Sequence, residues 1–208
     1  MSAPAMQVIV PVYRALPALQ RLVDGLRRTL GAGERVLFCD DASPEPEVSA
    51  YLQGLPGTLP FEARVLRRER NLGFVGNVNA AFAETGADDV VLLNSDTLPG
   101  VGWLDRLRTC FAADARIATA TPWSNNAEIC SLPHLCRPGP LPDDPDRWAR
   151  ACLDACRDAY LDLPTGVGFC MAIRRACLDR IGVFDAETFA RRGPRVAQCA
   201  LRRRVRRS

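Results

Sequence analysis

The sequence contains no lysine, and all 27 of its basic residues are arginine. It has a single histidine, His134. It also lacks any apolar run of about 18 residues, which excludes a membrane-spanning helix of ordinary length. The first residues, Met1 to Met6, carry no basic stretch ahead of an apolar one. We therefore expect no secretory signal and a cytoplasmic protein with reduced thiols.

Two common phosphate-binding motifs are also missing. Neither the GxGxxG pattern of dinucleotide-binding folds nor the GxxxxGKS or GxxxxGKT pattern of P-loops occurs. The nine cysteines lack the CxxC spacing of zinc sites. Cys130, His134 and Cys136 are the one local cluster of zinc-ligand types, and we keep zinc there as a minor alternative.

Charge is unevenly distributed along the chain. It carries 27 basic and 24 acidic residues, for a net charge of +3. Residues 191–208 hold 8 of the arginines and no acid, which leaves 19 arginines against 24 acids in the first 190 residues. We expect a mildly acidic globular domain, 1–190, followed by an irregular arginine-rich tail, 191–208.

Apolar strands and amphipathic helices alternate along most of the chain. Strands are expected at 7–12, 35–39, 64–67, 90–93, 117–121 and 168–173, and helices at 16–30, 45–52, 74–84, 103–111, near 147–159 and up to Ile181. This alternation favours an α/β fold with a mostly parallel sheet. The long proline-rich segment 122–163 has the character of a binding loop.

Polar residues follow three of the expected strands. The first strand ends in Pro11-Val12-Tyr13, the second in Asp40-Asp41-Ala42-Ser43 and the fourth in Asn94-Ser95-Asp96. In an open α/β sheet such ends share one edge, where ligands bind. Carboxylate and amide oxygens there suit a hard divalent cation that carries a diphosphate. The alternative is that the Asx residues only cap the turns before the next helices.

Six segments occur in an order that is typical of one enzyme family. They are VIVPVY at 8–13, CDDASP at 39–44, RNLGFVGNVNAAF at 70–82, VVLLNSDT at 90–97, TGVGFCMAIRR at 165–175 and IGVFD at 181–185. Together they resemble the family 2 glycosyltransferases, and most closely the bacterial rhamnosyltransferase-like branch that builds cell-surface polysaccharide. The resemblance implies an inverting enzyme with a GT-A fold, a Rossmann-like mostly parallel sheet flanked by helices.

The resemblance also implies a donor site. Asp40 or Asp41 would bind the base or ribose of the nucleotide, and Asp96 would ligate Mg²⁺ or Mn²⁺ beneath the donor diphosphate. Asn94 replaces the first carboxylate of the family's DxD motif and keeps an acceptor oxygen without its charge. The implied donor-binding set is Pro11, Tyr13, Asp40, Asp41, Asn71, Gly73, Asn79, Asn94, Ser95, Asp96, Thr165 and Gly166.

Several further positions have two interpretations. Asn77 and Asn79 match the family's N-x-G-x-x-x-N-x-N stretch, yet a plain turn before a core helix explains them equally well. Trp103 is expected to be a core residue rather than a platform for a sugar ring. Arg174-Arg175 could approach a phosphate or could simply begin a helix.

The catalytic base is not identified by the sequence. The family places it among acidic residues shortly after Phe189, but no Asp or Glu follows Glu187 in this chain. Asp185 and Glu187 are the remaining candidates. We expect the end of the chain to be out of register with its ancestry, as after a frameshift. The alternative is a genuine basic tail that binds an anionic membrane surface or nucleic acid.

These observations predict an enzyme that transfers sugar from a UDP-, dTDP- or GDP-sugar to a saccharide or lipid-linked acceptor. Transfer is expected to be poor because positioned base catalysis is worth roughly 10²–10⁴-fold. We expect no nucleic-acid partner, and peripheral association with the inner face of the membrane remains open. The alternatives are an inactive nucleotide-sugar-binding module and a basic-tail adaptor. A nucleotidyltransferase normally has a lysine-containing phosphate loop, which this chain lacks.

Overall fold

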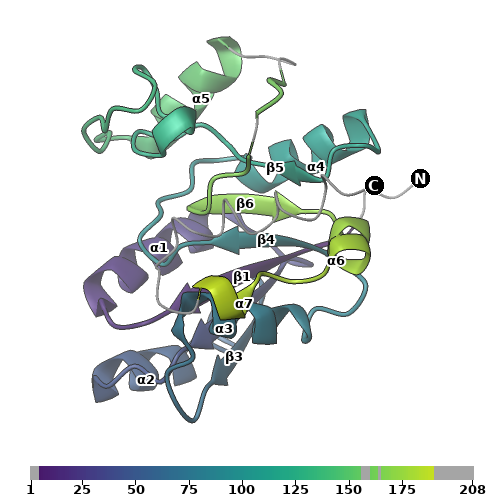
Figure 1. Ribbon diagram of the computed structural model, residues 1–208. Coiled ribbons are helices and arrows are strands. Elements are labelled where there is room, and N and C mark those ends of the chain that lie inside the picture. Colours follow the sequence, from purple (N-terminus) through teal and green to yellow (C-terminus); the bar gives the residue numbers. More distant parts are fainter. Residues whose placement is uncertain (1–4, 156–159, 164, 190–208) are drawn as a thin grey trace.

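The computed structural model describes residues 5–155, 160–163 and 165–189. A six-stranded sheet runs through the molecule in the order β3-β2-β1-β4-β6-β5, with helices on both faces (Figure 1). The strands are β1 (Met6–Val12), β2 (Arg35–Asp40), β3 (Glu62–Arg67), β4 (Asp89–Leu93), β5 (Thr119–Ala120) and β6 (Cys170–Ile173). The expected α/β fold with a mostly parallel sheet is confirmed.

The helices follow the strands as the sequence predicted, with two short additions. They are α1 (Leu16–Thr29), α2 (Pro46–Gln53), α3 (Gly73–Phe82), α4 (Trp103–Ala113), α5 (Pro145–Ala155), α6 (Arg175–Ile181) and α7 (Ala186–Phe189), with a 3₁₀ turn at Glu128–Cys130. The 3₁₀ turn and α7 were not predicted, because they are too short to show a helical period. None of the described helices is long and apolar enough to cross a membrane.

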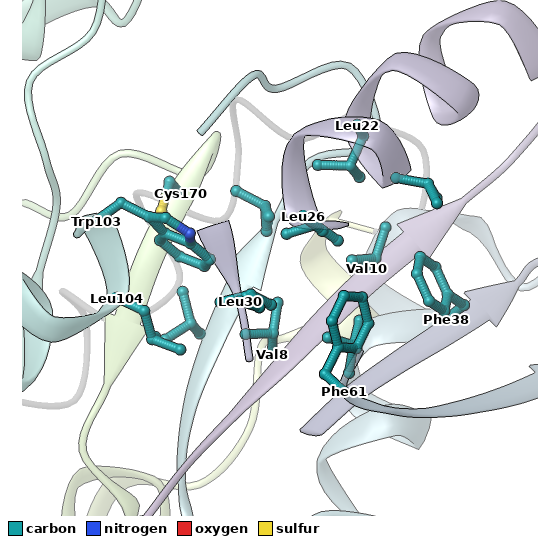
Figure 2. Packing of buried hydrophobic residues seen from close by; sticks show 14 of the residues in the cluster. Val8, Val10, Leu22, Leu26, Leu30, Phe38, Phe61, Trp103, Leu104 and Cys170 are labelled. Atoms are coloured by element: carbon teal, nitrogen blue, oxygen red, sulfur yellow. The ribbon is translucent and has the colours of Figure 1, made fainter. Parts of the chain in front are cut away.

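Alternation along the strands divides the core between the two faces of the sheet. Val8 and Val10 of β1 pack with α1 and α4 on one face (Figure 2), whereas Ile9 packs with α3 on the other. Strands that are buried on both faces form continuous apolar runs, which made them easy to predict. Trp103 lies in the first cluster and donates its indole N–H to Thr29 Oγ1 (3.3 Å), so its expected core position is confirmed.

β6 is the exception to the parallel sheet. It pairs antiparallel with both β4 and β5, whereas β1, β2, β3 and β4 run parallel to one another. The sequence did not predict this reversal, because a short strand buried on both faces has the same apolar pattern in either direction. Leu93 at the end of β4 pairs with Cys170 at the start of β6. The segment that precedes β6 therefore joins the carboxyl edge of the parallel strands.

Several elements begin or end at other residues than expected, and two of these differences are informative. The strand expected at 117–121 is reduced to the two residues of β5 at the edge of the sheet. The helix expected near 147–159 begins two residues earlier, at Pro145, and its last described residue is Ala155. Asp144 explains the start of α5, because its Oδ1 accepts the N–H groups of Asp146 (3.0 Å) and Arg147 (2.9 Å).

Arg174 closes the end of α4 and does not face a ligand. Its guanidinium donates to the carbonyls of Phe111 (2.8 Å), Asp114 (3.2 Å) and Ile117 (2.8 Å). It also lies over the Phe111 ring, 4.5 Å from the centroid. Because β6 is antiparallel, Arg174 and Arg175 lie at the amino edge of the parallel strands. They therefore lie at the edge opposite to the expected donor site, and they begin α6, which supports the second of their two interpretations.

Arg174→Ala should destabilise the fold, because it leaves three carbonyls, in the last turn of α4 and in the segment that follows it, without their donor. Hydrogen bonds from a charged group are worth about 1.5–3 kcal/mol, and we expect a loss of about 2–4 kcal/mol in the free energy of unfolding, measured with urea. Arg175→Ala is the matched control, since this side chain makes one exposed pair with Asp179 (2.8 Å). It should cost less than about 0.5 kcal/mol. Equal losses in both variants would contradict the capping role.

Candidate functional site

The strand order of the sheet reverses between β1 and β4. Starting at β1, the chain adds β2 and β3 on one side and only then β4 on the other. In open α/β sheets, ligands bind beyond the carboxyl ends of the strands at such a switch point. The β1–β4 ladder ends at the pair Ile9–Leu92, whereas β1 stays paired with β2 as far as Val12–Asp40. The residues that follow Ile9 in β1 and Leu92 in β4 are therefore no longer paired with each other.

The three predicted strand ends meet at this switch point. β1 lies between β2 and β4, so Pro11–Tyr13 stands between Asp40-Asp41 on one side and Asn94–Asp96 on the other. Neighbouring strands lie about 4.8 Å apart, so β2 and β4 are roughly 10 Å apart across the sheet. Pro11 lies just past the last β1–β4 pair, where its missing N–H costs no ladder bond. The expectation that these ends share one edge is confirmed.

Asp41 connects the end of β2 to the loop before α3. Its side chain is buried, and Oδ1 accepts the N–H of Leu72 at 2.7 Å. Burial raises the pKa of the Asp41 carboxyl above its ordinary value, and the N–H groups of Leu72 and Gly73 lower it part of the way back. The contact fixes the loop that leads into α3 against the carboxyl edge of the sheet.

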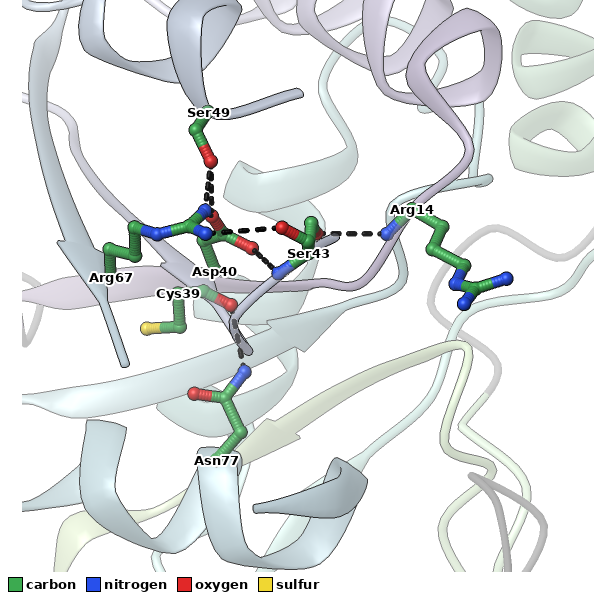
Figure 3. A network of polar contacts seen from close by, with 7 residues as sticks. All are labelled: Arg14, Cys39, Asp40, Ser43, Ser49, Arg67 and Asn77. Carbon is green, nitrogen blue, oxygen red and sulfur yellow. Dashed lines mark hydrogen bonds and ion pairs between the residues drawn. The ribbon is translucent and has the colours of Figure 1, made fainter. Parts of the chain in front are cut away.

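Asp40 is fully buried, and its carboxylate is occupied by the protein itself (Figure 3). Oδ1 accepts the N–H of Ser43 (2.8 Å), and Oδ2 accepts from the hydroxyl of Ser49 (3.0 Å) and from the guanidinium of Arg67. Arg67 also donates to the Ser43 carbonyl (3.1 Å). Asp40 thus fixes the loop after β2. Of the two acids expected to contact a nucleotide, only Asp41 also touches the α3 loop.

The turn after β4 presents an exposed carboxylate. The Asn94 N–H donates to the carbonyl of Phe169 (2.8 Å), and the Asn94 carbonyl accepts the N–H of Thr97 (3.1 Å). These bonds hold the turn against the segment before β6, with Asn94 and Ser95 half-buried. Asp96 is exposed, and no residue in the described part of the chain forms a hydrogen bond or ion pair with its carboxylate.

The segment 165–169 packs closely beside this turn. The Val167 N–H donates to Thr121 Oγ1 at 3.0 Å, which attaches the segment to the end of β5. A Cβ atom on Gly166 would lie 2.5 Å from the sulfur of Met171, so no other residue fits there without a shift. The structure therefore brings both predicted residues of this segment to the same edge as the turn after β4.

The loop after β1 has a strained backbone. Arg14 and Ala15 both adopt left-handed conformations, with φ of 64° and 59°. The Arg14 N–H donates to Ser43 Oγ (3.0 Å), and its guanidinium lies over the exposed ring of Tyr13, 5.2 Å from the centroid. Non-glycine residues in this region cost of order 1–3 kcal/mol and tend to occur at functional sites.

Asn71 and Gly73 form the turn that begins α3. Asn71 is exposed, and its Oδ1 accepts the N–H of Gly73 (2.9 Å). Gly73 has φ of 72°, a conformation that glycine adopts at little cost. This turn places the first residue of α3 next to the Asp41 contact, so the structure brings Asn71 and Gly73 to the carboxyl edge.

Asn77 and Asn79 both use their amide groups to join distant backbone segments. Asn77 is buried and donates to the carbonyl of Cys39 in β2 (2.7 Å). Asn79 donates to the carbonyl of Phe184 (2.8 Å) and accepts its N–H (3.0 Å). These partners support the structural interpretation of the two asparagines.

The described residues contain no group of three or more His, Cys, Asp or Glu side chains that could hold a metal ion. The structure does not gather Cys130, His134 and Cys136 into a zinc site: Cys130 is buried, and the other two are exposed. At Asp96 a single exposed carboxylate, two residues after Asn94, fits Mg²⁺ or Mn²⁺, provided that a bound diphosphate supplies further oxygens.

Asp185 and Glu187, the remaining candidates for the base, are both exposed. Glu187 lies in the first turn of α7, which packs against α3 (Figure 1). Residues 190–208, on which the expectations of a frameshift or a basic tail rest, lie outside the described residues.

Sequence reasoning missed the residues that hold the loops of the site. Arg67 and Ser49 around Asp40 were not predicted, and neither was Thr121 at the Val167 N–H; Ser43 was noted only as part of a polar strand end. A signal existed for Arg67, because it is the last residue of β3 and pairs in register with Asp40. A buried acid at a strand end needs a cation, and the neighbouring strand supplies one.

Known proteins resemble this chain over part of their length. The pre-mycofactocin glycosyltransferase of Mycobacterium tuberculosis, strain CDC 1551 / Oshkosh, is 32% identical over 115 residues, which cover 55% of this chain and 22% of that protein. The corresponding protein of strain ATCC 25618 / H37Rv gives the same values.

Solved glycosyltransferase structures share the fold. Mannosyltransferase PcManGT from Pyrobaculum calidifontis, in complex with GDP-Man and Mn²⁺, has a TM-score of 0.61 at 18% identity and matches 94% of this chain and 50% of its own. S. aureus TarS in complex with UDP-GlcNAc has a TM-score of 0.56 at 16% identity and matches 87% of this chain and 48% of its own. This chain spans about half the length of these proteins, and the expected GT-A fold is confirmed.

The family model described as glycosyl transferase family 2 matches residues 7–182. This range includes the ends of β1, β2 and β4 as well as the segment before β6. Because the match covers more than half of its residues, the chain belongs to glycosyl transferase family 2.

Proposed function

We propose that the chain binds a nucleotide-diphospho-sugar with a divalent cation and transfers the sugar, with inversion, to a hydroxyl of a saccharide or lipid-linked acceptor. The observation that carries this proposal is the placement of Asp41 and Asp96 on either side of the β1 end, at the switch point of the sheet. Membership of the family supports the same reaction. The bacterial branch that the motifs resemble favours cell-surface polysaccharide as the product.

Asp41 and Tyr13 are suited to the nucleoside. A buried carboxylate at a strand end can accept a hydrogen bond from a ring N–H or a ribose hydroxyl with little competition from water. The exposed Tyr13 ring at the end of the adjacent strand offers a face on which a base can stack. α3 begins beside Asp41, and the N-terminus of a helix favours anionic phosphates, although the N–H of Gly73 itself donates to Asn71.

Asp96 would hold Mg²⁺ or Mn²⁺ together with the amide oxygen of Asn94 and oxygens of the donor diphosphate. When bound, such a cation supplies Lewis-acid stabilisation of the departing nucleotide diphosphate. Asn94 brings no charge, so the protein offers one carboxylate and the donor supplies most of the remaining oxygens. Asp96 is available for this role because its carboxylate has no partner among the described residues.

The transfer step forms a bond between the acceptor oxygen and the anomeric carbon as the bond from that carbon to the diphosphate breaks. Attack from the opposite side inverts the configuration at this carbon, and the proton of the acceptor hydroxyl passes to a base. Asp185 and Glu187, exposed at the start of α7, are the acids that we assign to this side. The Thr165-Gly166 stretch borders the turn after β4 and lies on the sugar side.

Calorimetry with UDP, dTDP and GDP, each with and without Mn²⁺, tests the proposed donor site. We expect one of the three to bind and Mn²⁺ to strengthen its binding. An assay that measures the sugar released by hydrolysis of the matching nucleotide-sugar then tests whether the protein activates the donor. Absence of binding by all three nucleotides under both conditions would contradict the proposal.

A nucleotide-sugar-binding module without transfer activity is the second candidate. It is favoured by the sequence beyond Glu187, which contains no Asp or Glu to serve as the family's base. Such a module would bind nucleotide as the enzyme does and would leave the donor intact. Turnover comparable to that of an intact family member, with the right donor and acceptor, would exclude it.

Asp96→Asn should remove the effect of Mn²⁺ on nucleotide binding. The turn then offers the cation no carboxylate, and we expect affinity in Mn²⁺ to fall by about tenfold or more, since contacts to charged groups are worth about 1.5–3 kcal/mol. Affinity without Mn²⁺ should hardly change. Asp24→Asn is the control, because this acid is exposed on α1. A Mn²⁺ effect that persists in Asp96→Asn would assign the cation to other residues.

Asp40→Asn should act on stability. It removes the charge that pairs with Arg67 and accepts from Ser43 and Ser49 inside the fold. We expect the free energy of unfolding, measured with urea, to fall by about 2–4 kcal/mol. Normal stability in this variant would mean that the network around Asp40 is dispensable.

Asp41→Asn should act on binding instead. The pKa of Asp41 is raised in the folded state, so the native protein binds the proton more tightly and loses stability as pH rises above the ordinary carboxyl range. Removing the charge should leave stability at neutral pH unchanged or higher, while nucleotide affinity falls by about tenfold. Calorimetry and urea denaturation of the same sample measure both. Wild-type affinity in this variant would remove Asp41 from the donor site.

A further inference from the structure

Asn79 of α3 holds the backbone of a residue that is far away in the sequence. Its Nδ2 donates to the carbonyl of Phe184 (2.8 Å), and its Oδ1 accepts the N–H of the same residue (3.0 Å). The amide thus satisfies both backbone groups of one residue that lies 105 positions along the chain. Because its amide nitrogen and oxygen both form hydrogen bonds inside the fold, this side chain is poorly placed to bind the nucleotide-sugar donor.

The side chain of Phe184 is fixed to the same helix. It is buried, and its ring centroid lies 5.5 Å from that of Phe82, in an edge-to-face arrangement. Phe82 follows Asn79 by three residues and therefore lies on the same side of α3. One face of the helix thus holds both the backbone and the ring of Phe184.

Two exposed acids follow this fixed point directly. Asp185 is the next residue, and Glu187 lies in the first turn of α7. α7 packs against α3 and is drawn beside it in Figure 1. α3 itself begins at the loop that Asp41 holds at the carboxyl edge of the sheet. One helix therefore connects the proposed nucleotide contact with the segment that carries the acids.

We propose that Asn79 is a positioning residue for the acceptor side: it holds segment 184–187, whose acids receive the proton of the acceptor hydroxyl, and it does not bind the donor. This inference rests on the proposed function, and it revises the donor role that the family resemblance implied for Asn79. A base has to lie within hydrogen-bond reach of the hydroxyl that it deprotonates, so the segment that carries it needs a fixed position.

Asn77 makes the corresponding connection on the opposite side and provides a matched control. It lies two residues before Asn79 on the same helix, donates to the Cys39 carbonyl (2.7 Å) and accepts from Arg68 (3.0 Å). The two amides have the same chemistry and similar settings, but they hold different segments. Loss of either amide should raise the hydrogen-exchange rate only in the segment to which that amide is bonded.

The test compares Asn79→Ala, which loses both bonds, with Asn79→Asp, which keeps an acceptor for the Phe184 N–H. Hydrogen exchange of peptides covering 182–187 should become about tenfold faster in Asn79→Ala, as expected for the loss of roughly 1.4 kcal/mol of local protection. Nucleotide affinity in Mn²⁺ should stay within about twofold of the wild type. The hydrolysis kcat for the matching nucleotide-sugar should fall toward that of a variant with both Asp185→Asn and Glu187→Gln, and Asn79→Asp should lie between.

The controls separate this inference from general loss of stability. Asn77→Ala should speed exchange at the end of β2 and leave peptides covering 182–187 unchanged. A tenfold loss of nucleotide affinity in Asn79→Ala with unchanged exchange at 182–187 would assign Asn79 to the donor and overturn the inference, as would wild-type kcat. If the wild type binds none of the three nucleotides, the proposed function fails and the inference fails with it. If the wild type binds, a contrary result in the Asn79 variants overturns the inference alone.

Discussion

The parallel pairing of β2, β1 and β4 is the constraint on which the rest of the molecule depends. Strands that are buried on both faces cannot carry unpaired polar side chains along their length, so polar groups gather where the strands end. Since three such ends share one edge, Tyr13, Asp41 and Asp96 lie at the same edge of the sheet although they are distant in the sequence. The antiparallel strand β6 adds the segment before it to the same edge. The site is thus a product of the sheet as a whole.

The adjacent acids Asp40 and Asp41 have different roles because of the geometry of β2. Successive side chains of a strand point to opposite faces, so two neighbouring carboxylates meet different surroundings. Asp40 pairs with Arg67 at the same level of β3 and orders the loop after β2. Asp41 meets the loop before α3 and remains a buried acid with a raised pKa. Asp40 is fully used by the loop after β2, whereas Asp41, which also holds Leu72, is the acid that we assign to the ligand.

Much of this fold could be predicted from the sequence, because its elements are defined by local patterns. The buried strands and the amphipathic α1 show their periods within a few residues. The polar strand ends also predicted which edge of the sheet carries the candidate site. The direction of β6 could not be predicted, since its apolar pattern is the same in both directions. The bonds from Asn79 to Phe184 were also beyond reach, because they join segments that only the folded chain brings together.

α3 joins parts of the site that the sheet alone would leave separate. Its first residue follows the loop held by Asp41, and six residues later, about 9 Å along the helix axis, Asn79 holds Phe184. Side-chain amides suit such joints because one group donates and accepts at once and carries no charge to bury. A helix is rigid over this length, so the loop that Asp41 holds and the segment 184–187 that carries the two acids keep a fixed separation. The two halves of the proposed reaction are therefore positioned by one element, and the sheet has only to place the turn after β4 opposite to it.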